Sequence, residues 1–320
     1  MSNLETEPEE LVCPPDPPRG IEILEPRDVP LGGPRAMGVR RTLPQKARSL
    51  IGAWCFVDHY GPEPIAMDVP PHPHTGLQTV SWLFSGEIEH RDGVGSHAVI
   101  VPGGLNLMTA GRGIAHSEVS TTPATPEALE GSPSVLHGAQ LWIALPDSAR
   151  HGEPGFETYT PEPVAVGPAT LRVFLGSLAG STSTARVFSE LLGAQVDLPA
   201  GSSVTLDVDP RFEFGILLDS GALTVAGADV PVSHLAYLPP GSETLTLTAG
   251  STDARLLLIG GVPLGEQIVM WWNFIGRTHE EIVEYREDWE SGRRFAAVTG
   301  YDGDALPAPV MPPIRLRPRG

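Results

Sequence analysis

Two pairs of residues in the first half of the chain have the types and spacing of metal ligands. His72 and His74 stand two positions apart. His116 and Glu118 repeat that spacing further along the chain. Because side chains on a β-strand alternate between its two faces, each pair would point both of its groups in one direction. Two neighbouring strands could therefore direct three imidazoles and one carboxylate at one point inside a barrel.

This ligand set favours a divalent transition metal such as Fe, Mn, Co, Ni, Cu or Zn over Ca or Mg. Four protein ligands on an octahedral ion would leave two positions for water, substrate or dioxygen. A single buried histidine is usually a hydrogen-bonded core residue. Two such pairs in one β unit are harder to explain by packing, because every buried imidazole and carboxylate would need its own partner. The sequence therefore predicts a metal site.

The elements that must position these residues are predicted to be strands. The chain has 36 glycines and 34 prolines among 320 residues, and they separate many short apolar runs. That pattern is typical of all-β sandwiches and barrels. The dipeptide Asp92-Gly93 predicts a hairpin. One helix is expected near the end, with a capping box at Thr278–Glu281, an apolar face, and a stop at Gly292.

The second half of the chain repeats landmarks of the first half. The strand end at Gly86 resembles that at Gly221, and Pro102-Gly103 resembles Pro240-Gly241, at offsets of 135 and 138 positions. We interpret this as an internal duplication of one β-barrel unit.

The duplication provides an internal control for the metal site. The offset of 135 relates His72, His74 and Gln78 to Asp207, Asp209 and Glu213. The offset of 138 relates His116 and Glu118 to Ala254 and Leu256. A second site would lack one ligand pair, so we expect one metal per chain and interpret Asp207 and Asp209 as solvated turn residues.

Composition excludes several classes of protein. The chain has 39 acidic and 21 basic side chains, a net charge of −18. That charge argues against direct nucleic-acid binding and against attachment to an anionic membrane. No apolar stretch is long enough to span a membrane, and no secretory signal is visible. Only Cys13 and Cys55 are present, which excludes a disulfide framework and favours a reducing, cytoplasmic compartment.

Several longer strings resemble the pirin family of the cupin superfamily. HPHTGLQTVSWLFSGEIEHRDG and LMTAGRGIAHSE lie between Pro71 and Glu118, and further similarity lies at 56–62, 140–146 and 263–271. The resemblance implies a bicupin, with two tandem β-barrels of the double-stranded β-helix (jelly-roll) type and a short C-terminal helix. Its metal ligands fall on His72, His74, His116 and Glu118.

Composition and the resemblance together predict a domain organisation. Its parts are a flexible acidic and proline-rich segment, 1–19; a metal-binding cupin domain, 20–150; a metal-free cupin domain, 151–275; and a helix with a proline- and arginine-rich tail, 276–320. Residues 147–165 are expected to connect the two cupin domains.

Two functions follow from the resemblance. The first is quercetin 2,3-dioxygenase-type cleavage of a flavonol or other polyphenol by O2, with release of carbon monoxide. In that reading His116 and Glu118 are the catalytic residues, Glu118 takes the proton of the 3-hydroxyl group, and iron is the expected metal. The second is a redox-sensing regulator that binds a transcription factor or a metabolic enzyme. A monomer is expected in both cases.

The roles of some neighbouring residues stay open. Gln78 stands where many cupins carry a metal-binding glutamate, and we favour a hydrogen-bonding role for it over ligation. His59 either faces the site or lies away from it. His90 to Asp92 are expected at an exposed hairpin end, and Cys55 in the core. The following side chains either wall a pocket over the metal or pack in the core: Trp82, Phe84, Met108 and Trp142.

Overall fold

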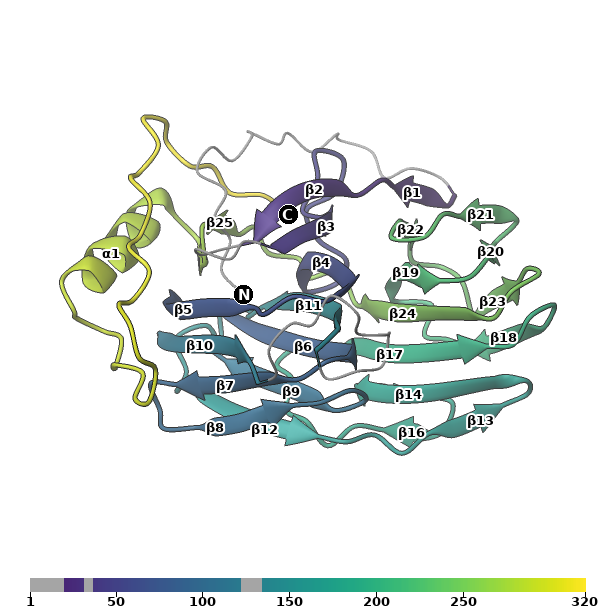
Figure 1. The fold of residues 1–320 in the computed structure, drawn as a ribbon. Coiled ribbons are helices and arrows are strands. Elements are labelled where there is room, and N and C mark those ends of the chain that lie inside the picture. The colour runs from purple at the N-terminus through teal and green to yellow at the C-terminus, as the bar shows by residue number, and fades with distance from the viewer. Residues whose placement is uncertain (1–19, 32–36, 122–133) are drawn as a thin grey trace.

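The structure is a computed structural model that describes residues 20–31, 37–121 and 134–320. The segment 1–19, predicted to be flexible, lies outside the described residues, and Cys13 with it. The described chain is almost entirely β-structure with a helix near the C-terminus (Figure 1). The predicted fold class, two barrels built from β-strands, is confirmed.

The first barrel consists of a seven-stranded and a four-stranded antiparallel sheet. In pairing order the larger sheet contains β12 (Gly155–Tyr159), β9 (Leu105–Thr109), β6 (Leu77–Ser85), β11 (Leu136–Ala144), β4 (Trp54–Glu63), β3 (Met37–Leu43) and β2 (Arg27–Leu31). The smaller sheet contains β5 (Asp68–His74), β10 (Ile114–Ser120), β7 (Ile88–Asp92) and β8 (His97–Ile100). The predicted hairpin at Asp92-Gly93 is confirmed, because β7 pairs with β8.

The second barrel repeats this plan strand for strand. Its larger sheet contains β1 (Glu22–Leu24), β22 (Leu235–Leu238), β19 (Glu213–Ser220), β24 (Ala254–Gly261), β17 (Leu191–Leu198), β14 (Ala169–Leu175) and β13 (Val164–Val166). Its smaller sheet contains β18 (Ser203–Asp207), β23 (Thr244–Ala249), β20 (Leu223–Val225) and β21 (Ala228–Val230). A short ribbon, β15 (Ser177–Leu178) and β16 (Ser181–Thr182), is attached to it.

The two larger sheets pack against each other and join the barrels. One apolar cluster contains Trp54 and Trp82 from the first barrel together with Phe174, Leu217 and Tyr237 from the second. Trp82 stacks on Phe174 with their ring centroids 4.6 Å apart. Strands in this position are covered on both faces, which explains why β11 is buried along its whole length.

One edge strand of each larger sheet does not belong to the barrel that its position in the sequence suggests. β1 precedes the first barrel in sequence but pairs with β22 of the second. β12 lies inside the segment 147–165, which was expected to be a connection, yet it pairs with β9 of the first barrel. The expectation of a plain connection is therefore wrong for 155–159. The residue limits of the two cupin domains stay a prediction.

One landmark of the duplication is confirmed and the other is wrong. Gly86 and Gly221 follow the equivalent strands β6 and β19 with φ of +86° and +88°. A Cβ atom on either would lie within 3 Å of the carbonyl oxygen of the residue before β11 or β24. Pro102-Gly103, however, joins β8 to β9, whereas Pro240-Gly241 joins β22 to β23. The loops differ in length, so one offset does not apply throughout.

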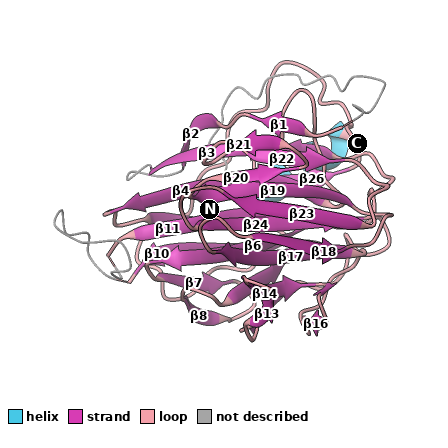
Figure 2. Ribbon diagram, turned by 90° about the vertical axis from the view of Figure 1, so that its right-hand side faces the viewer, coloured by secondary structure: helices cyan, strands magenta, loops and turns pink. Residues whose placement is uncertain are grey.

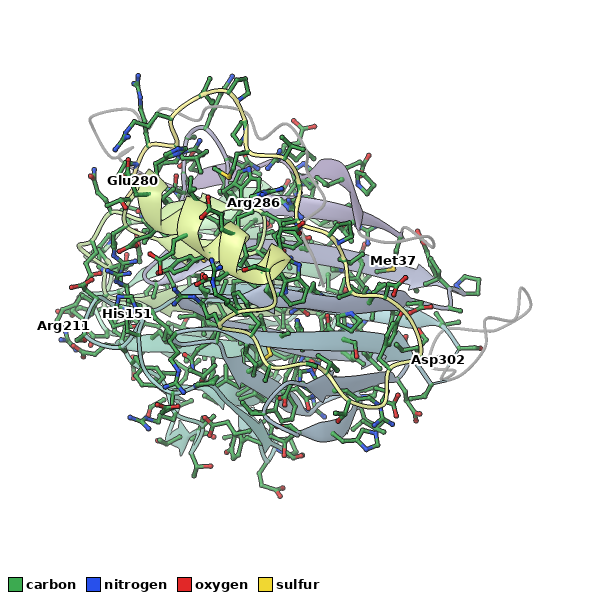
Figure 3. The ribbon with its side chains drawn as sticks, turned by 90° about the vertical axis from the view of Figure 1, so that its left-hand side faces the viewer. Met37, His151, Arg211, Glu280, Arg286 and Asp302 are labelled. Carbon is green, nitrogen blue, oxygen red and sulfur yellow. The ribbon has the colours of Figure 1, made fainter. Side chains whose placement is uncertain are left out.

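The C-terminal segment covers one end of the first barrel. It comprises the ribbon β25 (Val269–Trp271) and β26 (Phe274–Gly276), helix α1 (His279–Glu290) and the chain that follows. The predicted cap is present, since the Thr278 hydroxyl accepts a hydrogen bond from the Glu281 amide. In Figure 2 the helix is largely hidden behind the strands, and Figure 3, seen from the opposite side, shows α1 in front of the strands of the first barrel.

Candidate metal centre

Three of the four predicted ligands meet inside the first barrel. His72 and His74 lie at the end of β5, and His116 lies on the neighbouring strand β10, paired directly with His72. One ring nitrogen of each lies within 4.8 Å of those of the other two. The Nε2 atoms of His74 and His116 are 3.1 Å apart. Two ligands at right angles on an ion with bonds of about 2.1 Å would be about 3.0 Å apart.

The hydrogen bonds of His72 and His74 determine which ring nitrogen of each carries the proton and which can bind a metal. His72 Nδ1 lies 2.8 Å from the carbonyl oxygen of Pro70. His74 Nδ1 lies 3.2 Å from that of Asn273, in the C-terminal segment. A carbonyl oxygen can only accept, so both Nδ1 atoms carry the proton and both Nε2 atoms present a lone pair to the cluster.

The third histidine is held by another histidine. His116 Nδ1 lies 3.3 Å from His90 Nδ1, and His90 Nε2 lies 3.2 Å from Asp92 Oδ2. His90 and Asp92 are each only 2 % exposed. The expectation that the hairpin end at 90–92 is exposed is therefore wrong for both. The β7 strand carrying them lies between β10 and β8, and the ring of Phe156 stacks on His90.

The cluster suits a divalent cation better than it suits an empty core. Burial lowers the pKa of His72, His74 and His116 well below the usual range, so all three are neutral at pH 7. His72 Nε2 is buried without a hydrogen-bond partner among the described residues. Converging lone pairs with no donor between them repel one another, and a bound transition metal removes that repulsion.

Glu118 is close to this cluster but is not part of it. Its side chain is buried on β10, yet its carboxylate is outside the group of ligand atoms that lie within 4.8 Å of one another. The Ser81 hydroxyl lies 3.3 Å from Glu118 Oε1 and 2.8 Å from Gln140 Oε1. Burial and the charge of Glu118 raise the pKa of the nearby Tyr60 phenol. Glu118 thus lies in a polar part of the barrel interior.

The structure places Gln78 on the face of β6 that points toward the second barrel. Gln78 shares this face with Val80 and Trp82, at every second position, and both belong to the cluster between the barrels. Its amide nitrogen donates to the Thr109 hydroxyl and to the Arg186 carbonyl at 2.9 and 3.0 Å. These contacts agree with the favoured hydrogen-bonding role.

Among the aromatic candidates, Trp142 touches the cluster. Its ring meets that of His74 edge-on, with centroids 5.2 Å apart. Met108 packs in the same apolar cluster as Trp142. Trp82 and Phe84 instead contact Phe174 and Arg255 of the second barrel. Cys55 is fully buried, as expected of a core residue, and burial raises the pKa of its thiol.

His59 belongs to a second polar cluster, between the barrels. His59 Nε2 and His137 Nε2 lie 2.7 and 2.6 Å from Asp219 Oδ1, on β19. Asp219 Oδ2 accepts from Arg255 Nε at 2.6 Å, and the Ser233 hydroxyl lies 3.0 Å from His59 Nδ1. The guanidinium already compensates the carboxylate and would repel a metal ion. We interpret this group as a hydrogen-bond network around the Asp219–Arg255 ion pair that joins the barrels. No local pattern predicts this network, because His59 and Asp219 lie 160 positions apart.

The fold and the cluster together define a bicupin, two β-barrels of which the first has a histidine-rich interior. Profiles for the family confirm this: the one described as Pirin matches residues 36–143, and the pirin C-terminal cupin domain matches residues 193–296. The chain belongs to the pirin family. No helix in the described ranges is long and apolar enough to cross a membrane.

Individual relatives agree with this assignment. The chain is 40 % identical to "Putative quercetin 2,3-dioxygenase PA1205" of Pseudomonas aeruginosa, over 94 % of this chain and 93 % of the relative. It is 35 % identical to a pirin-like protein of Caulobacter vibrioides, over 80 % and 88 %. The crystal structure of quercetin 2,3-dioxygenase from Acinetobacter baumannii superposes with a TM-score of 0.85 at 35 % identity, covering 92 % of this chain and 97 % of that one.

Proposed function

We propose that this protein is a metal-dependent dioxygenase that opens the ring of a flavonol or a related polyphenol with O2 and releases carbon monoxide. The observation that carries the proposal is the convergence of three neutral imidazoles in the buried interior of the first barrel. Relatives named as quercetin 2,3-dioxygenases support the choice of reaction.

In this proposal the imidazoles of His72, His74 and His116 hold one divalent metal, for which we propose iron, and the Glu118 carboxylate, which lies outside the three-histidine group, turns toward the ion as a fourth ligand when the ion binds. The metal would acidify the 3-hydroxyl group of the flavonol and bring it together with O2. The three imidazoles are fixed by hydrogen bonds on the sides away from the cluster, so little reorganisation is needed to bind.

Glu118 is the proposed base. It is a buried carboxylate on the same strand as His116, and Ser81 and Gln140 lie beside it. A carboxylate in that position can take the proton of the substrate hydroxyl and hold it away from water. The ring of Trp142, next to His74, belongs to the apolar wall beside the cluster.

The test is anaerobic reconstitution with Fe(II), followed by quercetin and air. We expect loss of the flavonol absorbance together with release of carbon monoxide, and neither in His116→Ala. His151→Ala is the matched control, because His151 is exposed, and it should react like the unaltered protein.

A metal-loaded protein that leaves quercetin intact would contradict the proposed reaction. That result would favour the redox-sensing regulator, and capture of a protein partner by the Fe(II) and Fe(III) forms would be the next experiment.

A further inference from the structure

The three histidines of the cluster are held by different kinds of group. His72 and His74 each face a backbone carbonyl, which is a neutral acceptor. His116 faces the ring of His90, and His90 faces the carboxylate of Asp92. His116 is therefore the cluster histidine that is connected to a full negative charge through a second imidazole.

The carboxylate of Asp92 determines which atoms donate and which accept in this series of hydrogen bonds, from Asp92 through His90 to His116. The Asp92 carboxylate can only accept, so the facing Nε2 of His90 carries the proton. His90 Nδ1 then has a lone pair and accepts from Nδ1–H of His116. His116 Nε2 is left unprotonated and faces His74. The reverse order would set a lone pair of His90 against the carboxylate.

The hydrogen-bonded side chains of Asp92 and His90 are held in place as well as buried. Asp92 Oδ1 accepts from the amides of Val94 and Ser96 at 3.0 and 2.8 Å, which leaves Oδ2 for His90. The ring of His90 stacks on Phe156 with centroids 4.3 Å apart and planes at 15°. Asp92 is also the direct pairing partner of His116 across β7 and β10.

We propose that Asp92 and His90 are positioning residues that fix the tautomer of His116 and make it the most electron-donating histidine of the cluster. The inference rests on the proposed function only in taking the cluster as the metal site. A carboxylate at the end of such a chain raises the basicity of the terminal nitrogen. The site should therefore bind metal more tightly, and stabilise Fe(III) relative to Fe(II), because of these two residues.

Three variants separate this role from simple packing. His90→Phe keeps an aromatic ring against Phe156 but removes the acceptor. His90→Gln offers one acceptor and one donor, so it should rescue the chain in part. Asp92→Asn keeps the oxygen that caps the turn but places a donor against His90. His97→Phe, an exposed histidine on β8 with no part in the chain, is the control.

The first measurement is the state of the imidazoles in the metal-free protein, by long-range 1H–15N correlation spectra. We expect His116 to be protonated at Nδ1 in the unaltered protein, in His97→Phe and in His90→Gln. In His90→Phe and Asp92→Asn this single tautomer should be lost. The same His116 signals in all five proteins would overturn the inference.

The second measurement is metal binding by competition with a chelator, using Co(II), whose visible spectrum also reports ligand geometry. We expect binding about 10- to 100-fold weaker in His90→Phe and Asp92→Asn. The Fe(III)/Fe(II) potential should be higher in both variants. Unchanged affinity and potential would overturn the inference. An unaltered protein that binds no metal in the first barrel would instead overturn the proposed function, and the tautomer result would still stand.

Discussion

The two barrels share one strand order but have different interiors. The second barrel is filled by aliphatic side chains and Phe214, in a cluster drawn from both of its sheets. The first encloses three histidines and Glu118 among its apolar residues. The contrast is plainest on equivalent strands: β23 reads Thr-Leu-Thr-Leu-Thr-Ala, whereas β10 carries His116 and Glu118.

This difference indicates that the polar interior of the first barrel serves a ligand and not the fold. The second barrel closes with the same pairings and without a buried imidazole in its core cluster. Buried polar groups lower stability unless they are paired. The first barrel retains a buried His72 Nε2 with no partner among the described residues, and the proposed metal would bind that atom.

The largest expected effect is loss of metal from the first barrel. His72→Ala should reduce the metal content from about one ion per chain to nearly none, with circular dichroism unchanged, because the apolar clusters do not depend on His72. Asp207→Ala, at the related position of the second barrel, should leave the metal content unchanged. A full metal complement in His72→Ala, measured by inductively coupled plasma mass spectrometry, would remove His72 from the site.

The next effect concerns the rate of reaction. Glu118→Gln keeps the size and burial of the side chain but removes the base, so turnover of quercetin should fall by about 10²- to 10⁴-fold. Metal content and substrate affinity, measured on the same samples, separate this from loss of the ion. Turnover within threefold of the unaltered protein would show that Glu118 is not the base.

A substitution in the core of the second barrel should change stability without changing the metal content. Leu256 is fully buried in the second barrel, and Leu256→Ala should lower the free energy of unfolding by about 2–5 kcal/mol. Metal content should stay at one ion per chain. Loss of metal in this variant at temperatures where it remains folded would show that the two interiors are coupled.

The smallest effect is a dependence on pH that originates between the barrels. Burial lowers the pKa of His59, although its hydrogen bond to Asp219 opposes the shift. Below about pH 6.5 the unfolded chain therefore takes up a proton that folded His59 does not, and stability falls as the pH falls. From pH 7.5 to 5.5 the proton taken up by one unfolded histidine limits this loss to about 1.4 kcal/mol.

The matched variant for this prediction is His59→Gln, which can still donate to Asp219. Denaturant unfolding at pH 7.5 and 5.5 should show that the unaltered protein loses more free energy of unfolding than the variant, by up to about 1.4 kcal/mol. Equal losses would mean that His59 carries the same charge in both states. The Asp219 carboxylate also makes the free energy of unfolding fall as the pH falls, but in a lower pH range. Burial raises its pKa, and hydrogen bonds from His137 and His59 outweigh burial and hold the pKa below the usual range.

The local pattern of the sequence was sufficient to predict much of the cluster. Strand alternation correctly brought His72 and His74 to one face, and the family resemblance gave the bicupin fold. The hairpin signal at Asp92-Gly93 was also correct, but it led to the wrong expectation that His90 is exposed. Burial there depends on β10 and β12, which come later in the chain.

The spacing of residues along the sequence did not predict which strands of the two barrels are equivalent or how the barrels pack against each other. Ala254 and Leu256 lie on β24, the counterpart of β11, so the proposed equivalence with His116 and Glu118 is wrong. The true counterpart, β23, also lacks ligands, so the second barrel still offers no second pair. The contact of His59 with Asp219 depends on how two barrels pack, and strand spacing carries no information on that.

The most direct test is anomalous X-ray diffraction from a crystal of the metal-loaded protein, measured at the absorption edge of the metal. We predict one strong peak per chain in the first barrel, within bonding distance of Nε2 of His72, His74 and His116. A peak between His59, His137 and Asp219, or a peak in the second barrel with none at the three histidines, would contradict the account.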